Sequence, residues 1–320
     1  MKVYITGLAG FIGYHTAMKF ANEGWGVFGC DNFNDMIYDS ELKYVRSEML
    51  RCEYGIDVPN IDLDSVYYLE KDIKRVKPDL IIHLAAYPGV RVSMDHPEEY
   101  ITNNVMGTQN LIKVAESVGI ENVIYASTSC VMHGNPLPWK EYDKLGPHLS
   151  PYGYTKAANE SQFYVSKIKN AVGLRFFTVY GPWGRPDMAL FTFTKNILEG
   201  TPIEVNNNGD MKRDFTYVDD IVQGIWIVGN NMTERDIYCI GNGRQVDLMD
   251  FISVIEKELG LEATKEFMPR HPADAKETWS DTTKLQSLGY KPTVSVEEGV
   301  KNFIQWYRSC LLYTSPSPRD

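Results

Sequence analysis

The stretch Gly7-Leu8-Ala9-Gly10-Phe11-Ile12-Gly13 decides the fold, because it places a glycine at every third position between two apolar segments. The preceding residues 2–6 (KVYIT) predict a buried strand, residues 11–22 a helix and residues 27–30 a second strand. Glycines at such a junction allow a tight turn and a close approach of a pyrophosphate to the free N–H groups that begin the helix. The stretch therefore predicts a βαβ unit that binds a dinucleotide, with an ordinary strand-to-helix turn as the alternative.

Asp31 and Asn32 follow the second predicted strand, near the spacing of about 20 residues at which an acidic residue contacts the adenosine ribose. A carboxylate there accepts hydrogen bonds from the ribose and repels a 2′-phosphate. We therefore expect the cofactor to be NAD rather than NADP. A solvated turn is the alternative for Asp31.

The rest of the chain predicts an α/β protein with a Rossmann-type, doubly wound parallel sheet. Further strands are expected at 66–69, 80–85, 123–126 and 171–176, and they alternate with helices at 98–117 and 154–167. Helices near 190–198, 219–228 and 296–308 then indicate a smaller mixed α/β C-terminal substrate lobe. We expect a NAD-binding domain at 1–178 with interleaved returns near 214–235, a substrate-binding lobe at 179–308, and a disordered or non-native tail at 309–320.

Composition places the chain among ordinary globular proteins, with 320 residues, 43% hydrophobic and 23% charged. A net charge of −10 without a basic stripe argues against nucleic-acid binding, and no apolar run approaches the ~18 residues of a membrane span. The N-terminus lacks the pattern of a signal peptide, so we expect a cytoplasmic protein. The five dispersed cysteines suggest neither disulfides nor a metal site.

A catalytic pair is indicated by Tyr152 and Lys156, which share one face of a predicted helix. An ammonium next to a tyrosine lowers the pKa of its phenol, and the positive nicotinamide ring adds to this, so Tyr152 becomes a usable general base. Upstream, Thr128 and Ser129 lie at a predicted strand end, where a hydroxyl can hold the reacting oxygen of a substrate. An incidental surface pair and a structural hydroxyl cluster are the alternatives.

In these motifs the chain resembles the extended short-chain dehydrogenase/reductase superfamily, and within it the NAD-dependent epimerase/dehydratase family, over nearly all of residues 1–308. The resemblance implies that Thr128, Tyr152 and Lys156 are catalytic. It also implies a set of residues along NAD: Gly7, Gly10, Phe11, Ile12, Gly13, Asp31, Asn32, Asp72, Ile73, Leu84, Ala85, Ala86, Asn103, Tyr152, Lys156 and Phe176, with Asp72 and Ile73 flanking the adenine.

The segments 178–191 (TVYGPWGRPDMALF) and 212–220 (KRDFTYVDD) resemble the substrate-lobe signature of UDP-glucuronate 4-epimerases. This resemblance implies an isomerase that interconverts UDP-glucuronate and UDP-galacturonate through a 4-keto intermediate. The residues that it assigns to the UDP-sugar are Arg91, Thr128, Ser129, Thr178, Arg185, Arg213 and Arg270. Arg185 and Thr178 are expected at the carboxylate and Arg213 at the diphosphate.

Two loops depart from the family pattern, at Ser129-Cys130-Val131-Met132-His133-Gly134 and at His271-Pro272-Ala273-Asp274. The rival activities are a UDP-glucuronate decarboxylase, a neutral UDP-sugar 4-epimerase and, outside catalysis, a NAD-binding sensor. A 4,6-dehydratase is disfavoured because Ser129 and Cys130 cannot supply its carboxylate acid and base. We further expect a homodimer that pairs through the helices at 98–117 and 154–167.

Overall fold

A six-stranded parallel sheet organises the computed structural model, which describes residues 1–314. The strand order is β2-β1-β3-β4-β5-β10. The strands are β1 (Lys2–Thr6), β2 (Gly26–Cys30), β3 (Leu80–His83), β4 (Asn122–Thr128), β5 (Asn170–Phe176) and β10 (Arg235–Ile240). The expected Rossmann-type parallel sheet is thus confirmed.

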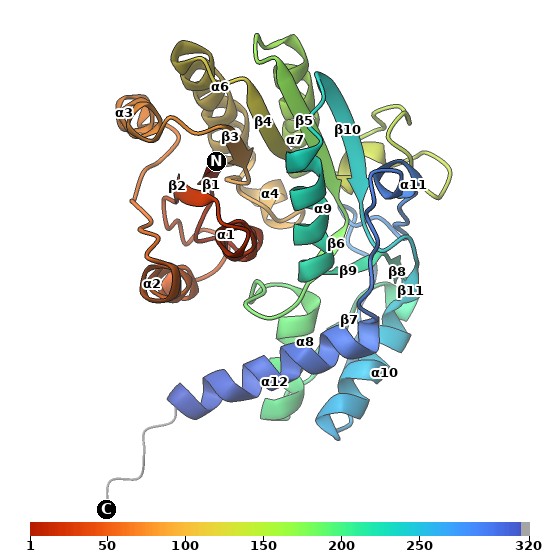
Figure 1. Cartoon of the computed structure of the whole chain (residues 1–320). Helices are drawn as coiled ribbons and strands as arrows, with labels where there is room; N and C mark the ends of the chain where they lie inside the picture. The colour runs from red at the N-terminus through yellow and green to blue at the C-terminus, as the bar shows by residue number, and fades with distance from the viewer. Residues whose placement is uncertain (315–320) are drawn as a thin grey trace, which may run out of the picture.

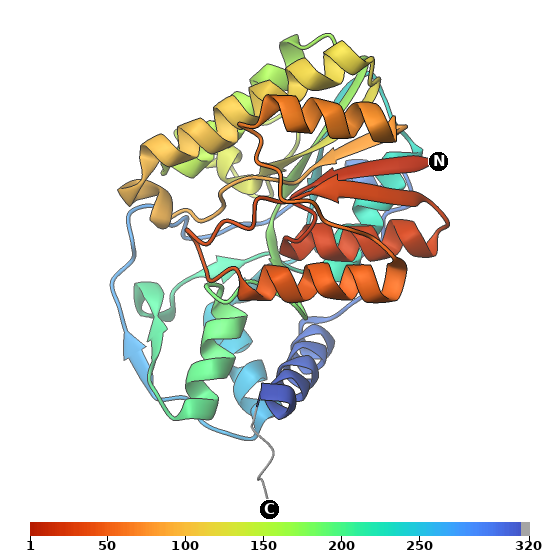
Figure 2. The same cartoon turned by 90° about the vertical axis from the view of Figure 1, so that its left-hand side faces the viewer.

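Helices cover both faces of this sheet (Figure 2). One layer holds α1 (Phe11–Asn22), α2 (Glu41–Tyr54) and α9 (Val218–Asn230), and the other holds α3 (Val66–Val76), α6 (Gly107–Val118) and α7 (Pro151–Val165). Successive residues of a strand point to opposite faces, so Val3 and Ile5 enter the core under α1 and α9, while Tyr4 enters the core under α3 and α6. Both faces of β1 are therefore apolar, as its sequence predicts.

A second group of elements lies beyond the carboxyl ends of the strands (Figure 1). It contains three small sheets, formed by β6 (Thr178–Tyr180) with β9 (Phe215–Tyr217), β7 (Ile203–Val205) with β12 (Lys265–Phe267), and β8 (Lys212–Arg213) with β11 (Val246–Asp247). Its helices are α8 (Ala189–Glu199), α10 (Leu248–Leu259) and α12 (Val296–Thr314), whereas α11 (Thr283–Gln286) packs beside β10 of the large sheet. A separate apolar cluster centred on Phe251 and Phe303 holds α8, α10 and α12 together.

Short helical segments complete the connections: α4 (Val92–Asp95), α5 (Pro97–Tyr100), the π-helical η1 (Ile101–Met106), and the 3-10 turns η2 (Ser129–Met132) and η3 (Asn206–Gly209). The expected helix at 98–117 is therefore α5, η1 and α6 in succession. No helix within residues 1–314 combines the length and the apolar character needed to cross a bilayer.

The expected strand at 66–69 is wrong, because these residues begin helix α3. Leu69, Ile73 and Val76 are buried and recur at helical spacing, whereas Tyr67 and Tyr68 are exposed. The β-branched and aromatic residues favoured a strand locally, but the spacing of the buried side chains is helical. The extended segment before α3 shrinks to a single bridge between Asp31 and Asn60.

The C-terminal tail also differs from expectation, since α12 continues through Ser309 to Thr314. The prolines that interrupt the helical pattern come later, at Pro316 and Pro318. The remainder of the expected tail, residues 315–320, lies outside the described residues.

A buried ion pair fixes α7 against β5. Arg175 donates through Nε and Nη2 to the two carboxylate oxygens of Glu160, each at 2.9 Å, and Ser127 donates to Glu160 Oε1 at 2.5 Å. The side chains of Arg175 and Glu160 are 3% and 6% exposed. Because the pair is bidentate and shielded from water, it fixes the rotation of the helix that carries Tyr152 and Lys156.

We expect Glu160→Ala to lower the free energy of unfolding by about 3–5 kcal/mol, since it leaves the Arg175 charge buried without its carboxylate. Chemical denaturation measures the change. The double variant Glu160→Met/Arg175→Met removes both charges and should recover most of the loss. A single variant as stable as the wild type would show that the pair does not hold α7.

Candidate active site

A cavity of about 1000 Å³ lies at the carboxyl ends of the strands, next to the switch point between β1 and β3 where dinucleotides bind in doubly wound folds. It extends from the glycine turn to the second group of elements. The predicted site residues that line it are Gly7, Gly10, Phe11, Ile12, Gly13, Asp31, Asn32, Leu84, Ala85, Ala86, Arg91, Asn103, Thr128, Ser129, Tyr152, Lys156, Phe176, Thr178, Arg185 and Arg213.

The glycine turn has the geometry that the sequence predicts. Gly7 has a φ of +74°, and its carbonyl oxygen accepts the N–H of Gly10 at 3.0 Å. A Cβ atom on Gly13 would lie 2.1 Å from that same oxygen, and one on Gly7 would lie 2.8 Å from the nitrogen of Ala85. All three glycines are therefore required sterically, and the start of α1 is left open toward the cavity.

Asp31 lies beside this turn in the position expected for a ribose contact. Its carboxylate accepts the N–H groups of Ala9 at 3.1 Å and Phe33 at 2.9 Å. Burial raises the pKa of Asp31, while the charge of Lys43 and these N–H groups oppose the rise. Asn32 donates to Asp62 at 2.7 Å, which ties the ribose end of the cavity to the segment before α3.

The adenine contacts expected from Asp72 and Ile73 are wrong. Both residues lie within α3, where Asp72 accepts hydrogen bonds from Tyr4 and Arg75 and Ile73 is fully buried in the core. Ile61 and Leu63 line the cavity instead. Both residues precede α3, in the segment that follows the bridge between Asp31 and Asn60.

The segment after β3 forms another wall of the cavity. Leu84, Ala85 and Ala86 line it, and Asn104 holds the following loop by accepting the N–H of Tyr87 at 2.7 Å and donating to its carbonyl at 3.0 Å. Asn103 and Asn104 both lie in the π-helical η1. The wider turn of a π-helix lets Asn103 line the cavity while its neighbour Asn104 holds the loop.

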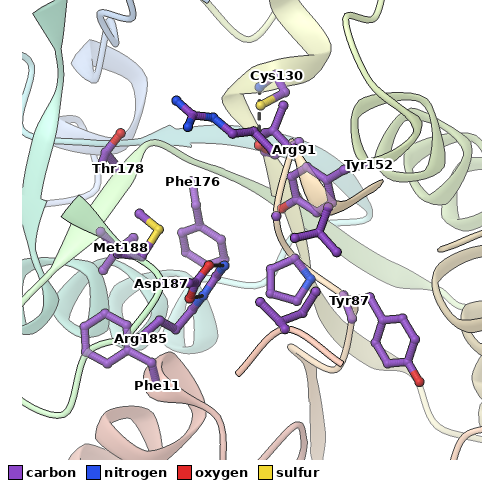
Figure 3. A pocket seen from close by; sticks show the side chains of 18 of the residues that line it. Phe11, Tyr87, Arg91, Cys130, Tyr152, Phe176, Thr178, Arg185, Asp187 and Met188 are labelled. Carbon is purple, nitrogen blue, oxygen red and sulfur yellow. Dashed lines mark hydrogen bonds and ion pairs between the residues drawn. The ribbon is translucent and has the colours of Figure 1, made fainter. Parts of the chain in front are cut away.

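Thr128, Tyr152 and Lys156 come together as predicted. Thr128 ends β4, and helix α7 begins beside it, with the Ser150 hydroxyl capping the N–H of Gly153 and Pro151 in the first turn. Tyr152 and Lys156 therefore sit in the first two turns of a helix whose start is fixed (Figure 3 shows Tyr152). Burial lowers the pKa of Lys156 to about 8, against the opposing charge of Glu160.

The expected lowering of the pKa of Tyr152 by Lys156 is not found in the protein's own side chains. Burial raises the pKa of Tyr152 to about 12, and Cys130 adds to the rise. The groups that lower it are the Thr128 hydroxyl, through a hydrogen bond, and the Arg185 charge. The cation that lowers the pKa of the phenol is thus Arg185.

The predicted substrate arginines Arg91, Arg185 and Arg213 already form hydrogen bonds or ion pairs within the protein. Arg185 donates through Nε and Nη2 to Asp187 at 3.0 and 2.5 Å, and Arg91 pairs with Asp274 at 2.6 Å across the cavity (Figure 3 labels Arg91, Arg185 and Asp187). Arg213 donates to the backbone carbonyl oxygens of residues 212, 275 and 276. Its guanidinium thereby holds the loop that carries Asp274.

Arg270, which was expected at the UDP-sugar, is exposed and lies outside the cavity lining, so its contact stays a prediction. The altered loop at 271–274 brings Asp274 to the cavity in its place. Sequence reasoning also missed several residues of the lining, namely Asn34, Tyr38, Lys43, Tyr87, Cys130, Asp187 and Met188. Asp187 and Met188 belonged to the quoted signature, whereas the others carry no local signal.

A parallel sheet with a glycine turn at its switch point and a Thr, Tyr and Lys set beside that turn defines a class of protein, the dinucleotide-binding enzymes of the short-chain dehydrogenase/reductase type. The comparisons narrow the class. The model of the NAD dependent epimerase/dehydratase family matches residues 3–241. The chain belongs to this family.

Relatives resemble the chain over nearly its whole length. An uncharacterized protein of Methanocaldococcus jannaschii is 42% identical over 314 residues, covering 96% of each chain. The UDP-glucuronate 4-epimerase of Thermodesulfobacterium geofontis is 36% identical over 307 residues and 94% of each chain. The crystal structure of UDP-glucuronic acid 4-epimerase from Bacillus cereus, in complex with UDP-glucuronic acid and NAD, has a TM-score of 0.89 at 35% identity, covering 97% of this chain and all of that one.

We expect Gly13→Ala to lose bound NAD and to lower the free energy of unfolding by roughly 1–3 kcal/mol, because the new methyl group overlaps the Gly7 carbonyl oxygen. Absorbance of cofactor released on denaturation measures the NAD content. Gly26→Ala is the matched control, since its methyl group would meet a flexible side chain at 3.3 Å. Full NAD content in Gly13→Ala would contradict the assignment of the turn.

We expect Lys156→Met to abolish turnover yet to stabilise the cofactor-free protein below pH 8. The fall in the pKa of Lys156 from 10.5 to about 8 corresponds to roughly 3 kcal/mol for burying the charge. Between these two pH values the unfolded chain binds the proton more tightly, so the wild type gains stability as the pH rises and the advantage of the variant shrinks.

Denaturation of the cofactor-free wild type and Lys156→Met at several pH values measures this difference. Lys113→Met, which replaces an exposed lysine on α6, is the control and should show no such trend. A stability difference that does not change with pH would mean that Lys156 is not buried as a charge.

Proposed function

We propose that this protein is a NAD-dependent epimerase that inverts C4 of UDP-glucuronate to give UDP-galacturonate. The observation that carries the proposal is the presence, in one cavity, of the glycine turn, the Tyr152 phenol beside Thr128, and the Arg185 guanidinium. The likeness to UDP-glucuronate 4-epimerases in sequence and in structure supports the same activity. UDP-glucuronate is an anion, and Arg185 supplies a cation for it within reach of the phenol.

The residues along the glycine turn fit NAD. The Cβ positions that would close the turn are absent at Gly7, Gly10 and Gly13, the start of α1 faces the cavity, and Asp31 disfavours a 2′-phosphate. NAD⁺ supplies the hydride acceptor at C4 and afterwards the hydride donor. A positive nicotinamide ring bound beside Tyr152 would add to the lowering of its pKa by Thr128 and Arg185.

Tyr152 takes the proton of the sugar 4-hydroxyl while the C4–H bond breaks with its electron pair, and a 4-keto sugar results. Thr128 donates a hydrogen bond to the same oxygen. When the sugar presents its other face, the hydride returns to C4 and Tyr152 gives back its proton. C4 is then inverted with no net oxidation, which is the outcome of an isomerase.

The 4-keto intermediate is a β-keto acid, so it loses CO₂ when its carboxylate bond aligns with the carbonyl π system. We assign Arg185 and Thr178 the task of holding the carboxylate out of that alignment. Asp187 keeps the Arg185 guanidinium oriented through the bidentate contact. A decarboxylase would need the opposite geometry at these residues.

The division of labour along the chain and the assembly belong to the same proposal. Residues 1–178 with the returns near 214–235 bind NAD, and residues 179–308 bind the UDP-sugar.

Exposed apolar side chains on η1 and α7, namely Ile101, Met106, Tyr164 and Val165, support a homodimer through these helices. The cytoplasmic location expected from the N-terminal sequence stays a prediction.

Incubation of the purified protein with UDP-glucuronate, followed by separation of the nucleotide sugars, tests the activity. We expect UDP-galacturonate without a pentose product, and we expect Tyr152→Phe to lower kcat by at least ~100-fold, since it removes the general base. Arg185→Ala should lose turnover or release CO₂. A wild type that yields only a UDP-pentose would be a decarboxylase, and one that binds NAD but turns over no UDP-sugar would be a sensor.

A further inference from the structure

Arg46, on helix α2, is a fully buried arginine that bridges the two halves of the active site. Its Nη1 donates to the carbonyl of Ala9, inside the glycine turn, at 3.0 Å and to the Tyr38 hydroxyl at 3.3 Å. Its Nη2 donates to the carbonyl of Trp183 at 2.5 Å. One guanidinium therefore contacts the cofactor turn and the segment that leads to Arg185.

The environment of Arg46 is unusual for a charge. Among residues 1–314 no carboxylate forms an ion pair with it, and its Nε has no hydrogen-bond partner. A buried cation with no carboxylate in direct contact is costly to maintain, although its charge also acts on the buried Asp31, and a neutral side chain would fill the core at less cost. A contribution to stability therefore does not explain why an arginine occupies this position. The backbone carbonyl groups that its planar guanidinium holds together explain it better.

The backbone that Arg46 holds is itself strained. Trp183 has a φ of +61°, a region that a bulky side chain rarely adopts and that costs on the order of 1–3 kcal/mol. The indole packs between Tyr14 and Trp306, at ring separations of 5.7 and 5.1 Å, while Arg46 fixes the carbonyl. Contacts from both sides keep this conformation in place.

A second buried side chain holds the preceding carbonyl. His15, on α1, lies 2.9 Å through Nε2 from the Pro182 oxygen. Burial lowers the pKa of His15 to about 4, and the nearby Arg46 charge adds to this effect, so the ring is neutral and donates from Nε2. Side chains on α1 and α2 therefore form hydrogen bonds with two consecutive carbonyl groups, those of Pro182 and Trp183.

The gripped segment leads directly to the substrate cation. After Trp183 come Gly184, whose N–H is held by the Gly181 carbonyl at 3.0 Å, and then Arg185. A shift of the Trp183 peptide is therefore passed to Arg185 with a single residue, the constrained Gly184, between them. The bidentate contact with Asp187 fixes the guanidinium relative to its own loop and cannot correct such a shift.

We propose that Arg46 and His15 are positioning residues that lock the Gly181–Arg185 segment to the glycine turn, so that the cofactor site sets the position of the carboxylate-binding Arg185. The proposal rests on the proposed function for the identity of the anion. It assigns the two side chains no contact with either ligand. They act only by fixing the position of the Arg185 guanidinium when NAD is bound.

Arg46→Lys is the informative variant, because lysine keeps the charge but lacks the planar fork that reaches Ala9 and Trp183 together. Arg51→Lys is the matched control, since Arg51 lies on the same helix but is exposed and pairs with Glu48. His15→Leu removes the second grip, and His15→Gln retains a donor on a side chain of similar length. If Arg46→Lys does not fold, the two His15 variants still test the proposal.

Calorimetry on the NAD-containing proteins measures the affinities for UDP-glucuronate and for UDP, which lacks the carboxylate. We expect Arg46→Lys and His15→Leu to lower the ratio of the two affinities by on the order of 10-fold or more while UDP binding is retained. Arg51→Lys should keep the wild-type ratio, and His15→Gln should restore much of it. Hydrogen–deuterium exchange of the peptide 181–188 should be faster in the two impaired variants.

An unchanged ratio together with unchanged exchange in Arg46→Lys would overturn the proposal. Equal weakening of UDP and UDP-glucuronate would overturn it too, because a merely structural role affects both ligands. Failure of the proposed function is visible separately, as a wild type that forms no UDP-galacturonate from UDP-glucuronate. In that case the exchange measurement still decides whether Arg46 and His15 hold the segment.

Discussion

The contact on which the site depends is the packing of the Gly7 carbonyl oxygen into the space that the Cβ atoms of Gly10 and Gly13 would occupy. Only bare backbone allows α1 to start this close to the end of β1. That approach fixes the direction of α1, and with it the open N–H groups at the cavity and His15 under Pro182. Cofactor binding and the position of the Pro182–Arg185 segment thus both require that no Cβ atom is present at Gly10 and Gly13.

Features encoded by local spacing were predictable from the sequence. The glycine turn, the first helix at 11–22 and the location of Tyr152 and Lys156 on one helix depend on neighbours within a few residues, and the structure has all three. The resemblance in the segment 178–191 likewise placed Thr178 and Arg185 at the cavity. These residues are read correctly because the backbone geometry that they need is set by their own sequence.

Features decided by distant partners were not predictable. The strand expected at 66–69 is a helix because its buried face packs on α6, and the residues expected at the adenine, Asp72 and Ile73, lie within that helix. The charge of Arg91 is partly offset by Asp274, which lies 183 residues further along the chain. Burial, which a sequence does not display, reverses the expected direction of the Tyr152 pKa.

Strand β10 has a consequence for how the chain can be divided. It pairs in parallel with β5, yet it is synthesised only after β6 to β9 and α8. A fragment that ends before residue 235 would leave the backbone of β5 unpaired at an open sheet edge, which invites pairing with other copies. The nucleotide-binding half is therefore not a separable module, and its completion during synthesis waits for the chain to return from the opposite lobe.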